Sequence, residues 1–580
     1  MTVFRNLLIA KSTATRPYYC EVEYLESNSA QQRISTGIMV DTLPITVDVS
    51  FSTASASYNS TYQVIVGTVT GDQYFIGFIS GDPAFAIKYN NVTYNTNIVP
   101  VADTIYRLTS TISNSDATLN INGTNYTNTM TYTANNEEIG LFAQKYGTKS
   151  NRIHACKIYK GSTLVRDFIP VLDWDMAPCM YDKVSGELFY NQGTGNFIAG
   201  RQIHPVEYLG FTGTQYIDTD LFAASDLKVE CECSTSTADG SNNPLFGGRE
   251  APAVNSFTVW RHLISSAAPR FDFGGNQRGA SQNLEADVWY KITKDGADNY
   301  IDDVPQLSNS DATFESETIK MIIGGVRSGT STISYIYYKG KIKSAKCWKA
   351  GVLKHDFIPA IDSDGVGFMF DRVSHTIHDN AGTGVFEYPP VQLEYIETDG
   401  TSYINTGYTP SGSTETEITT MLKDQTTSRF MFGCRTAQSN NTYACLAHNQ
   451  NRIGYRVGAS GGYFYSNGYN ELNVKHTYKI ANGVFYRDGE VVDATCEGAT
   501  TSPNSPLALL TINTNNVLDV TQPFVGNFYS CTMKENSTLV RDFIPCYKDG
   551  VVGMWDKVNE VFYANAGQGA FTAGKIKEER

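Results

Sequence analysis

The stretch MYDKVSGELFYNQGTGNFIAG begins at Met180 and recurs twice further along the chain. It returns as MFDRVSHTIHDNAGTGVFEY from Met369 and as MWDKVNEVFYANAGQGAFTAG from Met554. A second marker precedes it each time, as RDFIP at Arg166, HDFIP at His355 and RDFIP at Arg541. Three occurrences in the same order indicate an internal repeat.

An opening marker completes the repeat. VEYLES, VEYLGF and LEYIET begin at Val22, Val206 and Leu393, and the spacings of all three markers are 184–189 residues. This period is far longer than the 20–50 residues of a solenoid, so each copy is predicted to be a whole domain with its own core. We predict domains over 22–200, 206–388 and 393–574, after an N-terminal arm of residues 1–21. The links RQIHP (201–205) and EYPPVQ (387–392) contain Pro and no Gly/Ser run, which predicts stiff spacers.

Each copy has the pattern of β-structure. Residues 73–79 (QYFIGFI), 228–233 (KVECEC), 256–260 (SFTVW) and 483–489 (GVFYRDG) are short runs rich in β-branched and aromatic residues. The tetrapeptides NING and YRDG predict hairpin turns, because Asn-Gly and Asp-Gly supply the positive φ angles that such turns need. The sequence therefore predicts one antiparallel β-sandwich per copy.

The markers predict structural corners. In RDFIP, Phe and Ile are expected to be buried, and Pro to end the strand or lie at its edge. The preceding Arg-Asp predicts a salt-bridged corner, although His355 replaces Arg in the middle copy. Asn-x-Gly-x-Gly-x-Phe predicts a tight turn that leads into a last short strand, since no helix follows to make it a phosphate-binding loop.

Composition excludes several classes of protein. The 580 residues carry a net charge of −14 and no Lys/Arg-rich run, which argues against nucleic acid and anionic membranes as partners. Hydrophobic residues make up 41% of the chain, which is enough to form real cores. The sequence contains no run of 18 apolar residues, so no membrane span is predicted. The apolar run Leu7–Ala10 is too short for a signal peptide. We therefore expect synthesis in a reducing host cytoplasm without secretion by a signal peptide, and free thiols among the 11 Cys.

The set of markers resembles the concanavalin A-like (laminin-G-like) jelly-roll modules carried by structural, fibre and decoration proteins of tailed phages of gut bacteria. The resemblance runs from Val22 to Gly574. It implies an all-β fold of three tandem jelly-roll sandwiches, each with its first and last strands adjacent, and carbohydrate binding as a common role. Fold does not fix function, so the ligand stays open. The first copy departs from the pattern, because Arg33 stands where Tyr216 and Tyr403 stand in the others.

Catalytic patterns are weak. A retaining glycosidase of this fold needs three acids spaced along one strand, and Glu230 and Glu232 lack the third. The formal GxSxG at Gly458–Gly462, with Ser460, lacks the strand–helix context of a nucleophile elbow. We therefore predict no enzyme activity and no catalytic residue.

We also predict no metal ligands and no cofactors, and we leave the binding of Ca²⁺ open. Cys231 and Cys233 would point to the same face of a strand, and buried thiols are the preferred interpretation over a metal pair. Asp173/Asp175 and Asp362/Asp364 could ligate Ca²⁺, as laminin-G-like modules sometimes do, but solvated turns are preferred.

Function is expected to lie in adhesion. Phe4, Leu7, Leu8 and Ile9 form an apolar cluster that we interpret as a virion-docking arm, with a first strand or a loose terminus as the alternatives. The leading hypothesis is a virion protein (capsid decoration, head fibre or tail fibre) that binds host-surface glycans and contacts capsid or tail proteins. The alternatives are a ligand-free spacer and a glycan-degrading enzyme. Homo-oligomerisation is compatible with all three, and the sequence does not identify the carbohydrate-binding residues.

Overall fold

Every regular element that the structure describes is a β-strand, which confirms the all-β fold class. The structure is a computed structural model, and it describes residues 19–577 apart from 29–30, 55–62, 69–73, 80, 90–91, 130–135, 143–150, 174, 236–241, 252–253, 263–267, 311, 315–316, 330–337, 439, 461, 469–470, 494–502 and 549–550. The predicted docking residues Phe4, Leu7, Leu8 and Ile9 lie outside the described residues. Among the described residues no helix has the length and apolarity to span a membrane.

The chain divides into two compact units, Met1–Glu387 and Tyr388–Arg580. The division falls at the predicted link between the middle and third copies. The first unit contains the strands of the first two copies and the second unit those of the third. Whether each of the first two copies is an independent domain stays a prediction.

Two sheets form the first copy. The larger contains β1 (Tyr19–Val22), β2 (Leu25–Ser27), β4 (Ile45–Thr53), β9 (Tyr106–Ile112), β10 (Asp116–Ile121), β11 (Thr124–Thr129), β13 (Asn151–Lys160), β14 (Thr163–Asp173), β15 (Pro178–Asp182), β16 (Glu187–Phe189) and β17 (Ile198–Ala199). The smaller contains β3 (Ile34–Met39), β12 (Glu138–Leu141), β5 (Gln63–Thr68), β6 (Tyr74–Ile79), β7 (Asp82–Tyr89) and β8 (Val92–Asn95). Both sheets contribute to one core, in which Phe51 of β4 lies against Phe78 and Phe85.

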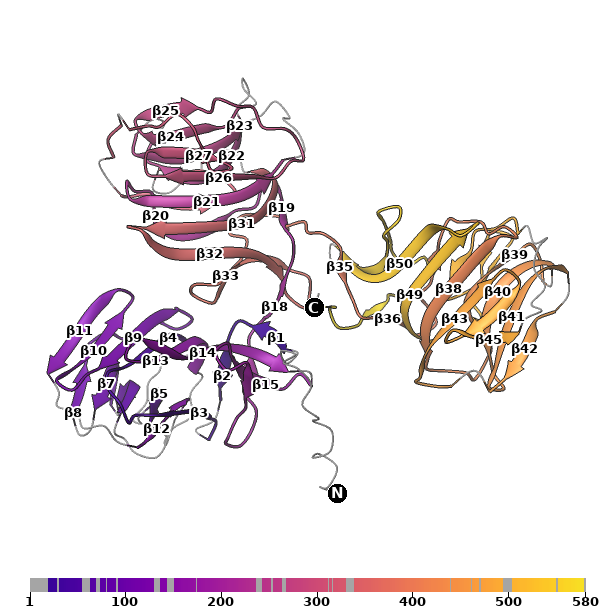
Figure 1. The fold of residues 1–580 in the computed structure, drawn as a ribbon, viewed down its shortest axis with the longest axis horizontal. Helices are drawn as coiled ribbons and strands as arrows, with labels where there is room; N and C mark the ends of the chain where they lie inside the picture. The colour runs from indigo at the N-terminus through magenta and orange to yellow at the C-terminus, as the bar shows by residue number, and fades with distance from the viewer. Residues whose placement is uncertain are drawn as a thin grey trace. The chain divides into compact units, whose positions relative to one another are not determined.

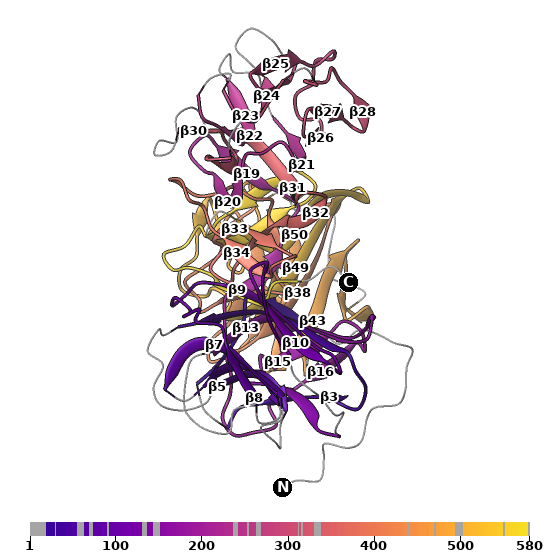
Figure 2. The same cartoon turned by 90° about the vertical axis from the view of Figure 1, so that its left-hand side faces the viewer.

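The middle copy has the same plan. Its larger sheet contains β18 (Gln202–Pro205), β19 (Leu209–Thr212), β21 (Leu227–Ser234), β26 (Tyr290–Asp295), β27 (Asp298–Ile301), β28 (Val304–Pro305), β31 (Lys339–Lys349), β32 (Val352–Ile361), β33 (Gly367–Asp371) and β34 (Thr376–His378). Its smaller sheet contains β20 (Ile217–Phe222), β29 (Lys320–Ile323), β22 (Asn243–Arg249), β23 (Ser256–His262), β24 (Arg270–Gly274), β25 (Asn276–Gly279) and β30 (Arg327–Ser328). Strands β21, β31 and β32 lie side by side in both views (Figures 1 and 2).

The third copy repeats the plan in the second unit (Figure 1). Its larger sheet contains β35 (Val391–Gln392), β36 (Ile396–Thr398), β38 (Thr414–Leu422), β43 (Lys475–Ala481), β44 (Val484–Arg487), β45 (Glu490–Asp493), β49 (Gly526–Glu535), β50 (Thr538–Lys548), β51 (Val551–Asp556), β52 (Val561–Tyr563) and β53 (Thr572–Ala573). Its smaller sheet contains β37 (Ile404–Asn405), β46 (Ala508–Leu509), β39 (Arg429–Arg435), β40 (Asn440–His448), β41 (Arg452–Ser460), β42 (Phe464–Asn467), β47 (Asn513–Thr514) and β48 (Val517–Leu518).

Strand order recurs in all three copies. The larger sheets read β11-β10-β9-β4-β13-β14-β15-β16, then β28-β27-β26-β21-β31-β32-β33-β34, then β45-β44-β43-β38-β49-β50-β51-β52. Strands from the beginning and end of a copy pair with each other, as β2 does with β17 and β36 with β53. These antiparallel pairings are those expected of the predicted sandwich.

The predicted hairpin turns are confirmed. Asn122 and Gly123 have φ angles of 51° and 95° between β10 and β11, and Asp488 and Gly489 have 51° and 84° between β44 and β45. Both pairs lie in the left-handed region that Asn-Gly and Asp-Gly tolerate.

The link RQIHP is itself part of a strand. β18 pairs with β1 of the first copy and with β32 of the middle copy, so the two larger sheets continue into each other. A link held in a β-ladder on both sides is stiff, as its composition predicts. Because β1 begins at Tyr19, the sheet also starts within the residues predicted as the arm.

The position predicted for the Pro of RDFIP is wrong in one respect. Pro170 lies inside β14 rather than at its end, where it pairs with Met180 of β15. On the other edge of β14, the neighbouring strand changes at this point. β13 pairs with β14 as far as Phe168, and β1 pairs with β14 from Val171 onward. Pro lacks an N–H, and it fits at the residue where no neighbouring strand needs one.

Candidate functional site

The predicted corner forms in every copy, as an Arg–Asp salt bridge in the first and third copies and as a His–Asp hydrogen bond in the middle one. The residue before Asp in the second marker pairs with the fully buried Asp of the third marker: Arg166 with Asp182 at 3.6 Å, His355 with Asp371 at 2.9 Å and Arg541 with Asp556 at 3.4 Å. The corner therefore links β14 to β15 and its equivalents in the other copies.

Backbone donors fix the buried carboxylate. Asp182 Oδ1 accepts the N–H groups of Asp167 and Val184, and Oδ2 accepts that of Ser185. In the middle copy, burial alone would raise the pKa of Asp371, but hydrogen bonds and charge from His355, with a further bond from Ser374, lower it to about 2. The carboxylate is thus ionised and acts as a structural cap rather than as a proton donor.

The Asn-x-Gly-x-Gly loop is tied to the stretch that follows the opening marker, which begins with Tyr403-Ile-Asn-Thr in the third copy. Asn565 Oδ1 accepts the backbone N–H of Tyr403 at 2.9 Å and that of Gly567 at 2.7 Å. Asn380 does the same for Tyr216 in the middle copy, and Asn191 for Arg33 in the first. The turn interpretation is confirmed in all three copies.

The aromatic side chains of this stretch do not face solvent. Tyr216 and Tyr403 are buried in their cores, whereas Arg33 at the equivalent position is exposed. The equivalent contact is made by the backbone N–H, so the side chain can change while the fold stays the same. The departure of the first copy therefore removes a core aromatic ring and not a binding group.

An exposed aromatic ring lies on the smaller sheet of the third copy. Tyr465 of β42 is 42% exposed, whereas its neighbour Phe464 packs against the core. Tyr465 pairs with Gly454 of β41, where an added Cβ would lie 3.0 Å from the Tyr465 ring. Gly454 thus provides a flat support for the ring.

Polar side chains surround this ring. The Arg452 guanidinium carbon lies 4.9 Å from the ring centroid, and the His448 ring meets Tyr465 edge-on at 4.9 Å. Arg452 Nη2 donates to Gln450 Oε1 at 2.5 Å, and Asn467 is the strand partner of Arg452. We call His448, Gln450, Arg452, Tyr465 and Asn467 the Tyr465 surface. Burial and the charge of Arg452 lower the pKa of His448, so the imidazole is neutral at neutral pH.

Tyr463, Phe464 and Tyr465 follow one another in the sequence, which alone does not separate exposed from buried rings. The structure separates exposed from buried rings, because successive side chains of β42 point to opposite faces of the sheet: Phe464 faces the core and Tyr465 faces away from it. The sequence also does not show that Gly454 lies beside Tyr465, because this pairing depends on the register of β41 and β42.

The formal GxSxG lies at the end of one strand and before the next. Ser460 ends β41, a strand that leads to β42 and not to a helix, so the context of a nucleophile elbow is not met. Cys231 and Cys233 are fully buried on one face of β21, and the hydrogen bond that the Cys231 thiol donates to Cys233, together with burial, raises the pKa of Cys231. The ten cysteines of the described residues are buried thiols that form no disulfide, as predicted.

The calcium candidates are held by turns. Asp173 Oδ1 accepts the N–H groups of Asp175 and Ala177, and its Oδ2 accepts the hydroxyl of Tyr190. Asp362 Oδ1 accepts the N–H groups of Asp364 and Val366, while Oδ2 pairs with Arg201 at 2.9 Å. These bonds are the ones that the preferred turn interpretation expects; calcium binding itself stays open.

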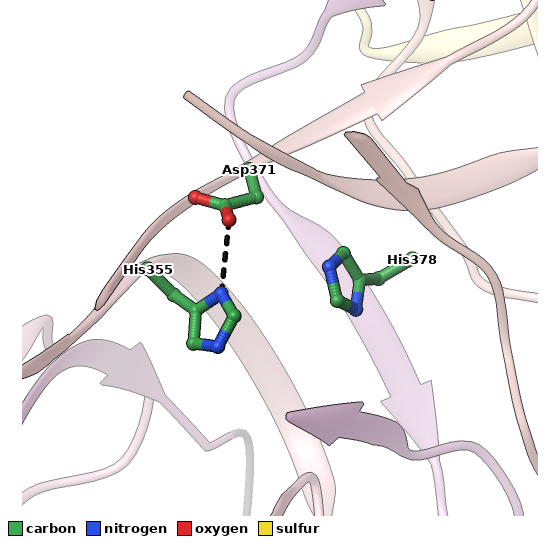
Figure 3. A group of neighbouring side chains, drawn as sticks. All are labelled: His355, Asp371 and His378. Carbon is green, nitrogen blue, oxygen red and sulfur yellow. Dashed lines mark hydrogen bonds and ion pairs between the residues drawn. The ribbon is translucent and has the colours of Figure 1, made fainter. Parts of the chain in front are cut away.

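One group of described residues has ligand atoms close enough to hold a metal ion. His355, Asp371 and His378 place one such atom each within 4.8 Å of the others (Figure 3). They come from β32, β33 and β34, which follow one another in the sheet. Sequence spacing missed the group because its members are 16 and 7 residues apart on separate strands.

Comparison with known proteins gives no family. No family model and no curated protein matches the chain. Among solved structures, the LG1–3 region of the laminin α2 chain has 10% identity and a TM-score of 0.25, covering 97% of this chain and 100% of that one. Domains LG4–5 of the mouse laminin α1 chain have 10% identity and a TM-score of 0.22, covering 64% and 98%.

A protein of Bacteroides ovatus, for which carbohydrate binding has been proposed, has 12% identity and a TM-score of 0.24, covering 60% of this chain and 93% of that one. At these identities and TM-scores, none of the three structures carries an inference about what this chain binds.

Proposed function

We propose that this chain is an adhesin that binds glycans through the Tyr465 surface. The observation that carries the proposal is the exposed Tyr465 ring, supported by Gly454 and bordered by Arg452, Gln450 and Asn467. Sugar sites combine an apolar platform with a few polar groups that fix orientation. A tyrosine ring is such a platform, and guanidinium and amide groups supply donors and acceptors for hydroxyl groups.

The proposed setting is a phage virion, where the chain is a capsid-decoration, head-fibre or tail-fibre component. Support comes from the threefold repeat with short links and from the resemblance of its markers to modules of phage structural proteins. Many copies on one particle would give avidity to sites that are individually weak. Residues 1–18 would attach the chain to a capsid or tail protein.

Binding of the full chain to a glycan array tests adhesion, with Tyr465→Ala as the test variant. Loss of binding in the variant supports the proposal. Absence of binding by the unaltered chain contradicts it and leaves the spacer hypothesis. Release of soluble sugar from host polysaccharide would instead favour the enzyme hypothesis.

Attachment is a separate question with a separate experiment. Cryo-EM density that places residues 1–18 against a capsid or tail protein supports the virion proposal. The same residues surrounded by solvent on an intact particle, or a particle that lacks the chain, would contradict it.

A further inference from the structure

We propose that the middle copy binds one divalent metal ion of the Zn²⁺ class between His355, Asp371 and His378. The inference concerns the first unit and is independent of the glycan proposal.

The three side chains converge from consecutive strands (Figure 3). His355 Nδ1 and Asp371 Oδ2 are 2.9 Å apart, and the ligand atoms of all three residues lie within 4.8 Å of one another. In a tetrahedral zinc site with bonds of 2.0–2.1 Å, ligand atoms are about 3.3 Å apart. The proton between His355 and Asp371 would leave on binding, and the widest of these separations, up to 4.8 Å, would have to shorten by up to about 1.5 Å.

The hydrogen bonds of His378 orient it as a ligand. Its Nδ1 lies 3.1 Å from the carbonyl oxygen of Asp218, so Nδ1 carries the proton, and Nε2 accepts from the Thr376 hydroxyl at 3.2 Å, a bond that a metal ion on Nε2 would replace. Metal-binding histidines are commonly held in this way by an acceptor on the other nitrogen.

Comparison between the copies shows what the two histidines replace. In the first copy the same positions are Arg166 and Phe189, and the guanidinium lies 5.4 Å from the centre of the Phe ring. In the third copy they are Arg541 and Tyr563. The middle copy therefore changes both residues together, from a cation and an aromatic ring to two imidazoles.

This paired change leaves the buried carboxylate without a permanent cation at the Arg position. Asp371 is fully buried. A bound dication would supply the positive charge that arginine supplies in the other copies.

Other charged groups near the site are already paired. Asp220 binds Lys320 at 2.5 Å, Asp218 binds Arg327 at 2.6 Å and Arg372 binds Asp356 at 2.7 Å. Arg107, whose charge also interacts with Asp371, is paired with Asp48 at 2.7 Å.

Ligand chemistry narrows the choice of metal. Two imidazoles and one carboxylate favour Zn²⁺ or a similar first-row ion over Ca²⁺ or Mg²⁺, which prefer oxygen ligands. His355 and His378 are only partly buried, so water can complete a tetrahedral set. The ion would join β32, β33 and β34 and stabilise this corner of the unit.

The test uses the full chain without a histidine tag. After dialysis, Zn²⁺ content is measured, and Co²⁺ is added as a spectroscopic probe of tetrahedral coordination. The chain itself provides the variant: His355→Arg with His378→Phe restores the pair found in the first copy and is therefore expected to fold. The proposal expects about one ion per chain with the visible absorption of tetrahedral Co²⁺, and neither in the double variant.

A stability measurement gives a second readout. Zn²⁺ should raise the melting temperature of the first unit in the unaltered chain and not in the double variant, because a ligand stabilises only a state that binds it. His378→Phe alone should weaken Zn²⁺ affinity by at least about tenfold. The absence of stoichiometric binding in the unaltered chain, or unchanged binding in the double variant, would overturn the proposal.

Discussion

The Oδ1 atom of Asp182 accepts the backbone N–H of Asp167 at 2.8 Å and thereby ties the third marker to the second. The same bond joins Asp371 to Asp356 at 2.9 Å and Asp556 to Asp542 at 3.0 Å. The most regular feature of the repeat is therefore a buried cap that holds two neighbouring strands together.

Replacing Asp182 with Ala should destabilise the first unit by about 3–5 kcal/mol. The change leaves Arg166 without its buried partner and three backbone N–H groups without their acceptor. Urea unfolding monitored by intrinsic fluorescence measures the loss. Glu187→Ala, on the exposed start of β16, is the control and should change stability by less than about 0.5 kcal/mol. Equal effects of the two variants would show that the cap is unimportant.

Gly567→Ala should destabilise the second unit by at least about 2 kcal/mol. A Cβ at this position would lie 2.1 Å from the carbonyl oxygen of Thr401, a backbone atom that the loop cannot avoid. Gly462→Ala is the matched control, since nothing lies within 4 Å of its added Cβ. The melting temperature of the second unit should fall for the first variant and stay nearly constant for the control; a similar shift in both would be inconsistent with a tight closing turn.

Lys294 should make the first unit more stable as the pH rises above 7. Its ammonium group is fully buried near Phe257 and Phe273, and burial lowers its pKa from 10.5 to about 7. Between these two values the unfolded chain binds the proton and the folded chain does not. The free energy of unfolding therefore gains up to about 1.4 kcal/mol per pH unit from this residue.

Lys294→Met isolates this contribution, because Met fills similar space without a charge. Urea unfolding between pH 7 and pH 9 should show a shallower rise in the variant than in the unaltered chain. The variant should also be the more stable of the two at pH 6, where the buried lysine is protonated. Identical pH dependence in both chains would rule out this role of Lys294.

Acid should destabilise the first unit well before carboxylates are protonated. Burial lowers the pKa of His154 and His375 to about 3 and that of His204 to about 4. Below pH 6.5 the unfolded chain takes up these protons and the folded chain does not, so the free energy of unfolding falls between pH 6.5 and 4.

Two of these histidines lie where the first and middle copies meet. His375 Nε2 lies 3.3 Å from the carbonyl oxygen of Val22, and Cys20 Sγ lies 3.8 Å from His204 Nε2. Melting temperatures of the full chain at pH 7, 5.5 and 4.5 test the prediction, and His375→Gln should reduce the pH dependence. A first unit as stable at pH 4.5 as at pH 7 would contradict it.

Much of the fold could be predicted because the backbone preferences of the turn residues and the threefold repeat both indicate the same β-sandwich. Asn122-Gly123 specifies its hairpin turn by backbone preference alone, and the three markers specify the repeat. The sequence predicted a salt bridge at Arg166 but not its partner Asp182, since a charged residue beside an apolar run needs a partner. Its partner became identifiable only after β14 and β15 were in register.

Other features depend on neighbours that the sequence does not place. Pro170 lies inside a strand because two different strands meet opposite it, and RQIHP becomes a strand because both larger sheets lie beside it. The exposure of Tyr465 depends on Gly454 of the next strand. The metal candidate was within reach of the sequence, since aligning the copies pairs His355 with Arg166 and His378 with Phe189.

Glycan binding by the full chain, with and without the Tyr465 ring, tests the central claim most directly. Tyr465→Ala removes the platform, whereas Tyr190→Ala removes a ring of equal exposure whose hydroxyl is already bonded to Asp173. The account predicts that the unaltered chain and Tyr190→Ala bind the same glycans and that Tyr465→Ala loses at least about tenfold in affinity, or 1.4 kcal/mol. Equal binding by the unaltered chain and Tyr465→Ala, or no binding by either, would contradict it.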